Sequence, residues 1–160
     1  MPRSTPADRR RHAQSLPPPS ARDRDAIADF LERLWAESGL ARQTLDSYRR
    51  DLDGLARWLD GRGKTLESAD RGALFDYFSE RMRLGYAPRS NARLLSALRA
   101  FYAQLLRRGT ITVDPAALLE APKLGRSLPK ALSESQVESL MQAPDIDDPA
   151  GLRDRAMLEL

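Results

Sequence analysis

The sequence predicts an all-α protein with an orthogonal four-helix bundle, an extended linker and the first helices of a second domain. Apolar residues recur three and four positions apart along most of the chain, as on the buried face of an amphipathic helix. Alternating β-branched residues are absent, and residues 110–113 are the only β-like patch. A length of 160 residues suffices for one domain with a hydrophobic core and the beginning of another.

The first two helices are predicted from apolar spacing and from the glycines that follow them. The first is expected from Asp23 to Ser38, with Gly39 as its stop. Its buried side comprises Ile27, Phe30, Leu31 and Leu34. The second is expected to start near Arg42 and to end before Gly61. Its buried stripe comprises Leu45, Tyr48, Leu52, Leu55 and Leu59.

The third helix is predicted to open with Ser68 as N-cap and to end at Gly85. Its expected buried side comprises Leu74, Phe75, Phe78 and Met82. The fourth begins with Pro88, whose missing N–H is not needed in a first turn, and is closed by Gly109. One face of it carries Leu94, Leu95, Leu98, Phe101, Tyr102 and Leu105, and the opposite face carries Arg89, Arg93, Ser96, Ala100 and Arg107.

The remaining segments give the predicted domain boundaries. Residues 1–22 are basic and are predicted to be a disordered tail, and residues 23–120 to be the helical domain, closed by a short helix at 114–120. Residues 121–132 contain two prolines and a glycine without apolar periodicity, which is typical of an extended linker. The basic residues of this linker are Lys123, Arg126 and Lys130. Two further helices are expected in residues 133–160, as the truncated start of a second domain, and Ser133 is the predicted N-cap of the first of them.

The fourth helix and the predicted linker concentrate the positive charge of the chain. The formal net charge is only +3, but residues 86–130 hold eight basic against two acidic residues, and residues 133–160 hold two basic against seven acidic. A helix with arginines and no acid suits a phosphate backbone, because each neutralised phosphate releases a counterion. The small residues Ser96, Ala97 and Ala100 are expected to let the helix backbone approach a partner closely. Double-stranded DNA is therefore the expected partner. The side chains expected to reach base edges and phosphates stand at two helix tips: Arg42, Gln43, Thr44 and Ser47, and Arg89, Ser90, Asn91 and Arg93.

The basic face is also compatible with other roles. It could be an ordinary solvated surface, or it could bind an acidic protein partner in a helical interaction module. A small helical DNA-binding regulator without any catalytic function is a further alternative.

The residue inventory argues against several kinds of active site. The chain has no cysteine, and its single histidine, His12, lies in the predicted tail, so no His-based metal site or nucleophilic triad is expected. The acidic run at 145–148 lacks the glycine turn and distal glutamate of a calcium loop. We expect no cofactor and no metal. No apolar run reaches the length of a membrane span and no secretory signal is visible, which predicts a cytoplasmic protein.

Several segments resemble the N-terminal part of the Xer tyrosine site-specific recombinases, in particular the XerD subfamily. They are TLDSYRRDLDGLARWL, SNARLLSALRAFYAQLLRRG, DPAALLEAPKLGRSLPKALSESQVESLMQAP and GLRDRAMLEL, and the resemblance extends from about residue 25 to residue 160. It implies a SAM-like core-binding domain joined by an extended linker to a catalytic domain, the two clamping DNA between them. It further implies that the second and fourth helices enter the major groove through Thr44, Ser47, Arg50, Arg89, Ser90 and Arg93. Lys123, Arg126 and Lys130 would follow phosphates.

The resemblance also implies an enzymatic parent and its partners. In this family a tyrosine attacks a phosphodiester, and arginines, a lysine and histidines stabilise the transition state. Those residues would fall beyond Leu160, so residues 1–160 are expected to bind DNA without cutting it. Such a parent would resolve chromosome dimers at a short two-armed site, in a heterotetramer with a XerC-like recombinase, with a DNA translocase as a candidate further partner.

Overall fold

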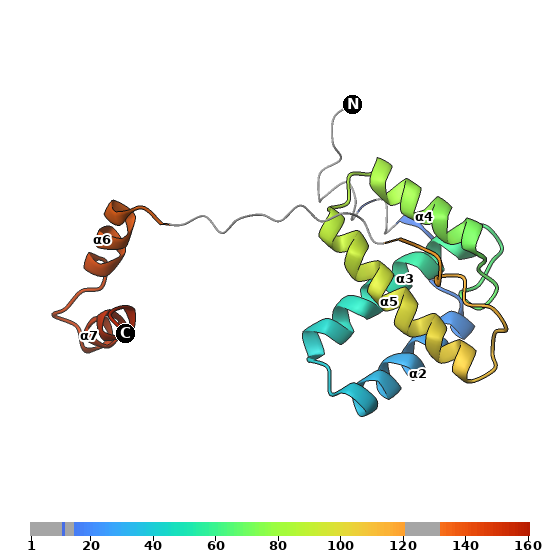
Figure 1. Ribbon diagram of the computed structural model, residues 1–160, viewed down its shortest axis with the longest axis horizontal. Coiled ribbons are helices and arrows are strands. Elements are labelled where there is room, and N and C mark those ends of the chain that lie inside the picture. Colours follow the sequence, from blue (N-terminus) through green and yellow to red (C-terminus); the bar gives the residue numbers. More distant parts are fainter. Residues whose placement is uncertain (1–10, 12–14, 121–131) are drawn as a thin grey trace. The chain divides into compact units, whose positions relative to one another are not determined.

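The structure is a computed structural model that describes residue 11, residues 15–120 and residues 132–160. In order, the described helices are α2 (Ala21–Ser38), α3 (Arg42–Asp60), α4 (Arg71–Arg83), α5 (Pro88–Arg107), α6 (Glu134–Gln142) and α7 (Pro149–Leu158) (Figure 1). No strand occurs among the described residues, so the all-α fold class is confirmed. The chain divides into two compact units, Met1–Leu124 and Gly125–Leu160, and each is described by itself.

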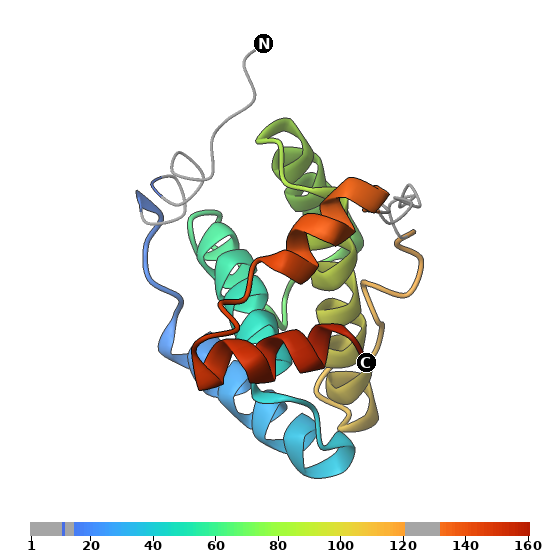
Figure 2. The same cartoon turned by 90° about the vertical axis from the view of Figure 1, so that its left-hand side faces the viewer.

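Helices α2 to α5 of the first unit pack around one core. Figure 1 shows α3 and α5 crossing, with the N-terminal end of each on the left-hand side of this unit. In both Figure 1 and Figure 2, α4 lies at the upper end of the crossed pair and α2 at the lower end. The arrangement places the beginnings of two helices that are far apart in sequence on one side of the unit.

The helix ends follow from their capping residues. The Ser20 hydroxyl accepts a hydrogen bond from the Asp23 N–H at the start of α2, two residues earlier than expected. Residues 20–22 therefore belong to the helical unit and not to the predicted tail. Gly39, with a φ of 58°, ends α2 in the left-handed conformation that glycine adopts most easily. The predicted N-cap of α4 was wrong: Asp70, and not Ser68, accepts from the Ala73 N–H at 2.7 Å.

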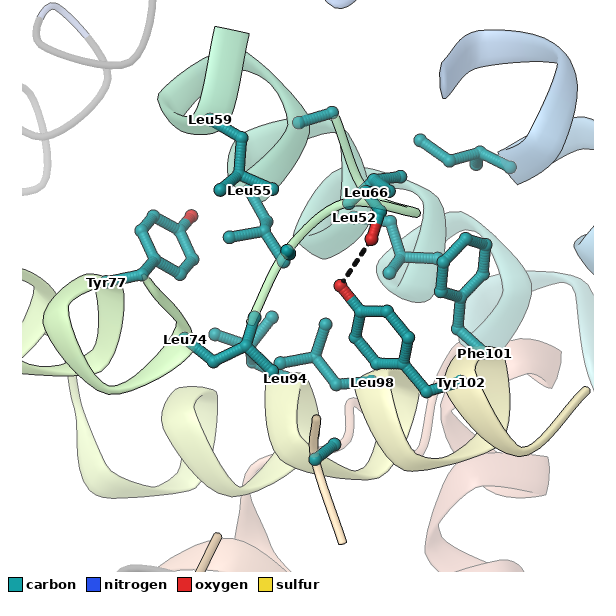
Figure 3. Packing of buried hydrophobic residues seen from close by; sticks show 14 of the residues in the cluster. Leu52, Leu55, Leu59, Leu66, Leu74, Tyr77, Leu94, Leu98, Phe101 and Tyr102 are labelled. Atoms are coloured by element: carbon teal, nitrogen blue, oxygen red, sulfur yellow. Dashed lines mark hydrogen bonds between the residues drawn. The ribbon is translucent and has the colours of Figure 1, made fainter. Parts of the chain in front are cut away.

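Apolar faces of α2, α3 and α5 meet in the core as the sequence predicted (Figure 3). Leu52, Leu55, Leu59, Leu94, Leu98, Phe101 and Tyr102 are fully buried. The ring of Phe101 packs edge-on against Phe30 at a centroid distance of 5.3 Å, which joins α5 to α2. This core fixes the orientation of the outer faces of α3 and α5.

Helix α4 is rotated relative to the prediction. Leu74 is buried, but Phe75 and Met82 are 63% and 61% exposed and were wrongly assigned to the core. Tyr77 and Arg81 take their place. The Arg81 Nε donates to Asn91 Oδ1 at 2.9 Å, and its guanidinium lies 4.0 Å from the ring centroid of Tyr86. A buried cation with polar and aromatic neighbours can face the interior, which hydrophobic spacing alone does not anticipate.

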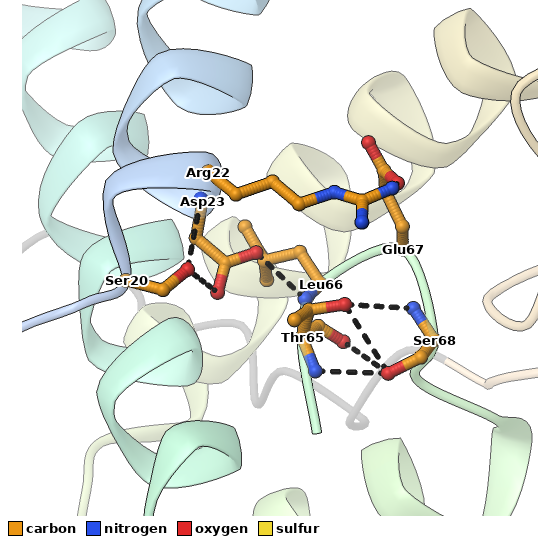
Figure 4. Close-up of polar contacts among 7 residues, drawn as sticks. All are labelled: Ser20, Arg22, Asp23, Thr65, Leu66, Glu67 and Ser68. Atoms are coloured by element: carbon orange, nitrogen blue, oxygen red, sulfur yellow. Dashed lines mark hydrogen bonds and ion pairs between the residues drawn. The ribbon is translucent and has the colours of Figure 1, made fainter. Parts of the chain in front are cut away.

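A polar clamp holds the loop between α3 and α4 against the rest of the unit. The Leu66 N–H donates to the buried Asp23 carboxylate at 2.9 Å, and Ser20 Oγ donates to the same carboxylate at 3.0 Å (Figure 4). On the other side, the Tyr102 hydroxyl donates to the Leu66 carbonyl oxygen at 2.9 Å (Figure 3). Both backbone groups of Leu66 are thereby satisfied in the interior, which a loop crossing a core requires.

The segment after α5 and the second unit complete the described chain. Residues 114–120 form hydrogen-bonded turns and not the predicted short helix; Asp114 Oδ1 accepts from the Ala116 N–H at 2.7 Å. In the second unit the predicted cap is confirmed, since Ser133 and Gln136 form a reciprocal capping box at the start of α6. Within the described ranges, no helix combines the length and apolar character that crossing a bilayer would require.

Candidate nucleic-acid interface

The N-terminal end of α3 presents the first group of predicted DNA-binding side chains. Arg42 is exposed, and Thr44 and Ser47 are half-buried within the first two turns. Ser47 Oγ donates to the Gln43 carbonyl at 2.8 Å and accepts from Arg50 Nη2 at 3.2 Å. Arg50 Nε also donates to the Asp46 carbonyl at 3.0 Å. These bonds hold the Arg50 guanidinium along the helix surface while leaving it without a carboxylate partner among the described residues.

The N-terminal end of α5 presents the second group. Pro88 starts the helix, and no side chain of the described residues caps it. Exposed Arg89 and half-buried Ser90 stand in the first turn, where the helix dipole favours an anion. Asn91, in contrast, is buried, and its Oδ1 accepts from Arg81, so it is withdrawn from the predicted tip.

Arg93 is the one predicted DNA-binding arginine in the described residues that has an acidic partner. Its Nε donates to Asp51 Oδ2 at 2.8 Å and its Nη2 to Asp51 Oδ1 at 3.2 Å, across the contact between α5 and α3. The hydrogen bond from Arg93 to Asp51 raises the pKa of Arg93 above its ordinary value, so the guanidinium stays charged. This pair ties one helix to the other.

The outer face of α5 differs from the prediction in one respect. Ser96 is exposed and Ala100 half-buried, but Ala97, predicted to allow close approach of a partner, is fully buried. Further along α5, Arg99 Nη2 donates to the Leu119 carbonyl at 2.7 Å and so fixes the turns after the helix. Arg89 and Arg107 have no ion-pair partner in the described part of the chain. The predicted linker residues Lys123, Arg126 and Lys130 lie outside the described residues.

The described residues contain little that would support another kind of site. They hold no cluster of three or more histidine, cysteine or acidic side chains suited to a metal ion. Sequence reasoning missed Asp51, because an acid on a predicted helix gives no sign of a partner 42 residues away. The available signal was that Asp51 directly precedes Leu52 and lies on the side of the second helix that carries the buried stripe.

The surface formed by the two helix tips belongs to a known kind of domain. Residues 27–109, which contain α3, α4, α5 and most of α2, match the family model described as "Phage integrase, N-terminal SAM-like domain". The chain belongs to this family. The matched region covers more than half of the 160 residues and includes both helix tips.

Several similar proteins identify more specifically which recombinases this chain resembles. The chain is 65% identical over 160 residues to a protein named tyrosine recombinase XerD from Xanthomonas campestris pv. campestris, covering 100% of this chain and 50% of that protein. Proteins of the same name from Pseudomonas aeruginosa and Ralstonia nicotianae are 52% identical over 134 residues and 48% over 145. These alignments cover 84% and 91% of this chain, and 45% and 46% of the two relatives. The resemblance to XerD-like tyrosine recombinases is confirmed, and the chain spans about half the length of these relatives.

Proposed function

We propose that this chain is the DNA-binding portion of a XerD-like site-specific tyrosine recombinase. The observation that carries the proposal is the pair of helix tips on one side of the helical unit. They contribute Arg42 and Arg50 from α3 and Arg89 from α5, none of them paired with a carboxylate in the described residues. A polyanion can satisfy all three arginines at once. We take this polyanion to be DNA, because the similar proteins are named recombinases.

The side chains at the two tips are expected to have different tasks from those of the linker. Arg42, Thr44, Ser47, Arg50, Arg89, Ser90 and Arg93 would contact base edges and nearby phosphates in the major groove. Lys123, Arg126 and Lys130, which the structure does not describe, would follow the phosphate backbone. Arg93→Ala should accordingly weaken discrimination between matched and scrambled duplexes, whereas Lys130→Ala should weaken binding to all duplexes alike.

We expect the residues that carry out the reaction of the parent enzyme to lie outside residues 1–160. By resemblance, the reacting tyrosine and its supporting arginines, lysine and histidines would follow position 160. We therefore expect residues 1–160 to bind DNA and to leave a supercoiled plasmid intact. In the whole enzyme the partners would be a short two-armed recombination site, a XerC-like recombinase in a heterotetramer and a DNA translocase, acting in chromosome dimer resolution.

Duplex binding at several salt concentrations tests the proposal. Fluorescence anisotropy with a labelled random-sequence duplex should give an affinity that falls steeply with salt, by about one power of ten in affinity per tenfold of salt for each neutralised phosphate. Arg89→Ala should reduce that slope by about one unit. Affinity independent of salt, or absent, would favour a protein-interaction module instead. A covalent protein–DNA adduct formed by residues 1–160 alone would contradict the expectation that these residues bind DNA without cutting it.

A further inference from the structure

The two side chains of the Asp51–Arg93 ion pair are buried to different extents. The Asp51 side chain is 6% exposed, whereas the Arg93 side chain is 44% exposed. The carboxylate is therefore enclosed between α3 and α5, while almost half of the Arg93 side chain is exposed. Asp51 has no other side-chain hydrogen-bond donor among the described residues, so its only direct bonds are to Arg93.

The geometry of the pair decides which edge of the guanidinium remains available. A guanidinium carries five N–H donors in a rigid plane. The carboxylate engages the side edge, with Nε and one hydrogen of Nη2, at 2.8 Å and 3.2 Å. Three donors remain, two on Nη1 and one on Nη2, and one donor from each of these nitrogens forms the end edge. Two parallel donors from Nη1 and Nη2 match the O6 and N7 acceptors that guanine presents in the major groove.

The pair also changes what Arg93 contributes to binding. Together with Asp51 it is electrically neutral, so it adds little to the long-range attraction of DNA. Arg42, Arg50 and Arg89 have no such acid among the described residues and supply net positive charge. A neutral pair in which the carboxylate fixes the side edge and leaves the end edge unbonded is suited to recognition by geometry. The unpaired arginines are suited to attraction by charge.

We propose that Asp51 is a positioning residue that holds Arg93 for bidentate recognition of one guanine in the target duplex. This inference rests on the proposed function, because it requires that the α3–α5 surface meets the major groove. Beyond the proposed function, it assigns a role in specificity to Asp51 and identifies the recognised base as guanine.

A purely structural role for Asp51 predicts a different outcome. If the pair only joined α3 to α5, loss of Asp51 would weaken folding and all DNA binding together. If Asp51 positions Arg93, removing its charge makes the surface more positive, so affinity for unrelated DNA should be retained or increased. Only the preference for one guanine should be lost.

The test uses the full 160-residue chain and a duplex that the wild-type chain selects from a randomised library. Binding is measured for the selected duplex, for a scrambled duplex and for single-base variants of the selected one. The test variant is Asp51→Asn, and the control is Asp53→Asn, two residues further along α3. Asp53 has no ion pair among the described residues, and its substitution removes the same charge. Circular dichroism verifies that both variants are folded.

We expect Asp51→Asn to lose about tenfold in preference at one guanine, the same guanine that Arg93→Ala no longer recognises. Its affinity for the scrambled duplex should equal that of Asp53→Asn. Unchanged base preference in Asp51→Asn, or an equal loss on selected and scrambled duplexes, would overturn the inference while leaving the proposed function intact. Failure of the wild-type chain to bind or select any duplex would instead overturn the proposed function, and the inference with it.

A second measurement does not depend on the fold of a variant. The NMR signal of the Arg93 Nε–H in the wild-type chain should keep its hydrogen-bonded shift when the selected duplex is added, because Asp51 stays in place. If the signal moves to the position of a free arginine, DNA has displaced the carboxylate, and the positioning role is wrong.

Discussion

Tyr102→Phe tests the polar clamp on the loop between α3 and α4. The substitution removes the hydroxyl group, which donates a hydrogen bond to the Leu66 carbonyl oxygen at 2.9 Å. Both residues are 0% exposed. The carbonyl would be left buried without a partner, a loss that costs about 1–3 kcal/mol. With a loss of about 2 kcal/mol, the thermal midpoint of a helical unit of about 100 residues should fall by about 10 °C.

Thermal and urea unfolding followed by far-UV circular dichroism measure this loss. The dependence of unfolding free energy on urea should keep its slope, because the surface buried in the native state does not change. Tyr48→Phe is the matched control: Tyr48 is half-buried, and its hydroxyl has no hydrogen-bond partner in the described part of the chain. Its loss should stay below about 0.5 kcal/mol. Equal losses for the two variants would show that the Leu66 carbonyl is satisfied in another way.

Three further predictions concern the same helical unit. Gly39→Ala should lower the free energy of unfolding by about 1 kcal/mol in a urea titration, because alanine is strained at a φ of 58°; no loss would place the end of α2 elsewhere. Asp23→Ala should destabilise more than Asp23→Asn in the same titration, since asparagine can still accept from the Leu66 N–H at 2.9 Å; the reverse order would refute the clamp. Burial raises the pKa of Tyr77 to about 12, so the stability it contributes is present below its unfolded pKa of about 10 and is lost as the pH rises through about 12. Unfolding at stepped alkaline pH measures this loss, which Tyr77→Phe should reduce and which an unchanged profile would disprove.

Much of the fold could be predicted because the helices carry strong local signals. The three- and four-residue spacing in α2, α3 and α5 reflects faces that pack on one core, so periodicity and burial agree. Ser133 and Gly39 were identified as helix ends because their capping chemistry involves only residues within one turn. Local chemistry of this kind can be read without knowing what packs against the helix.

Helix α4 shows where such reasoning fails. Its four predicted core residues include two that are more than half exposed, Phe75 and Met82, because the helix turns Tyr77 and Arg81 inward instead. Burial of Arg81 depends on Asn91, at the start of α5, and on the ring of Tyr86. These partners come from other segments, so an apolar-spacing rule ranks phenylalanine above arginine and selects the wrong face.

The same limit applied at the candidate interface, with a different consequence. The sequence identified Arg93 as an outward cation, and its exposure agrees with that prediction. It could not show that a carboxylate from α3 holds the guanidinium by its side edge, because the two residues are 42 positions apart. A count of basic residues treats Arg89 and Arg93 as equivalent. Within the described chain, however, Arg89 has no ion-pair partner, whereas Arg93 forms a neutral pair with Asp51. The two substitutions should therefore have different effects on DNA binding. Replacing Arg89 should chiefly reduce the salt dependence of the affinity, and replacing Arg93 should chiefly reduce the preference for one DNA sequence.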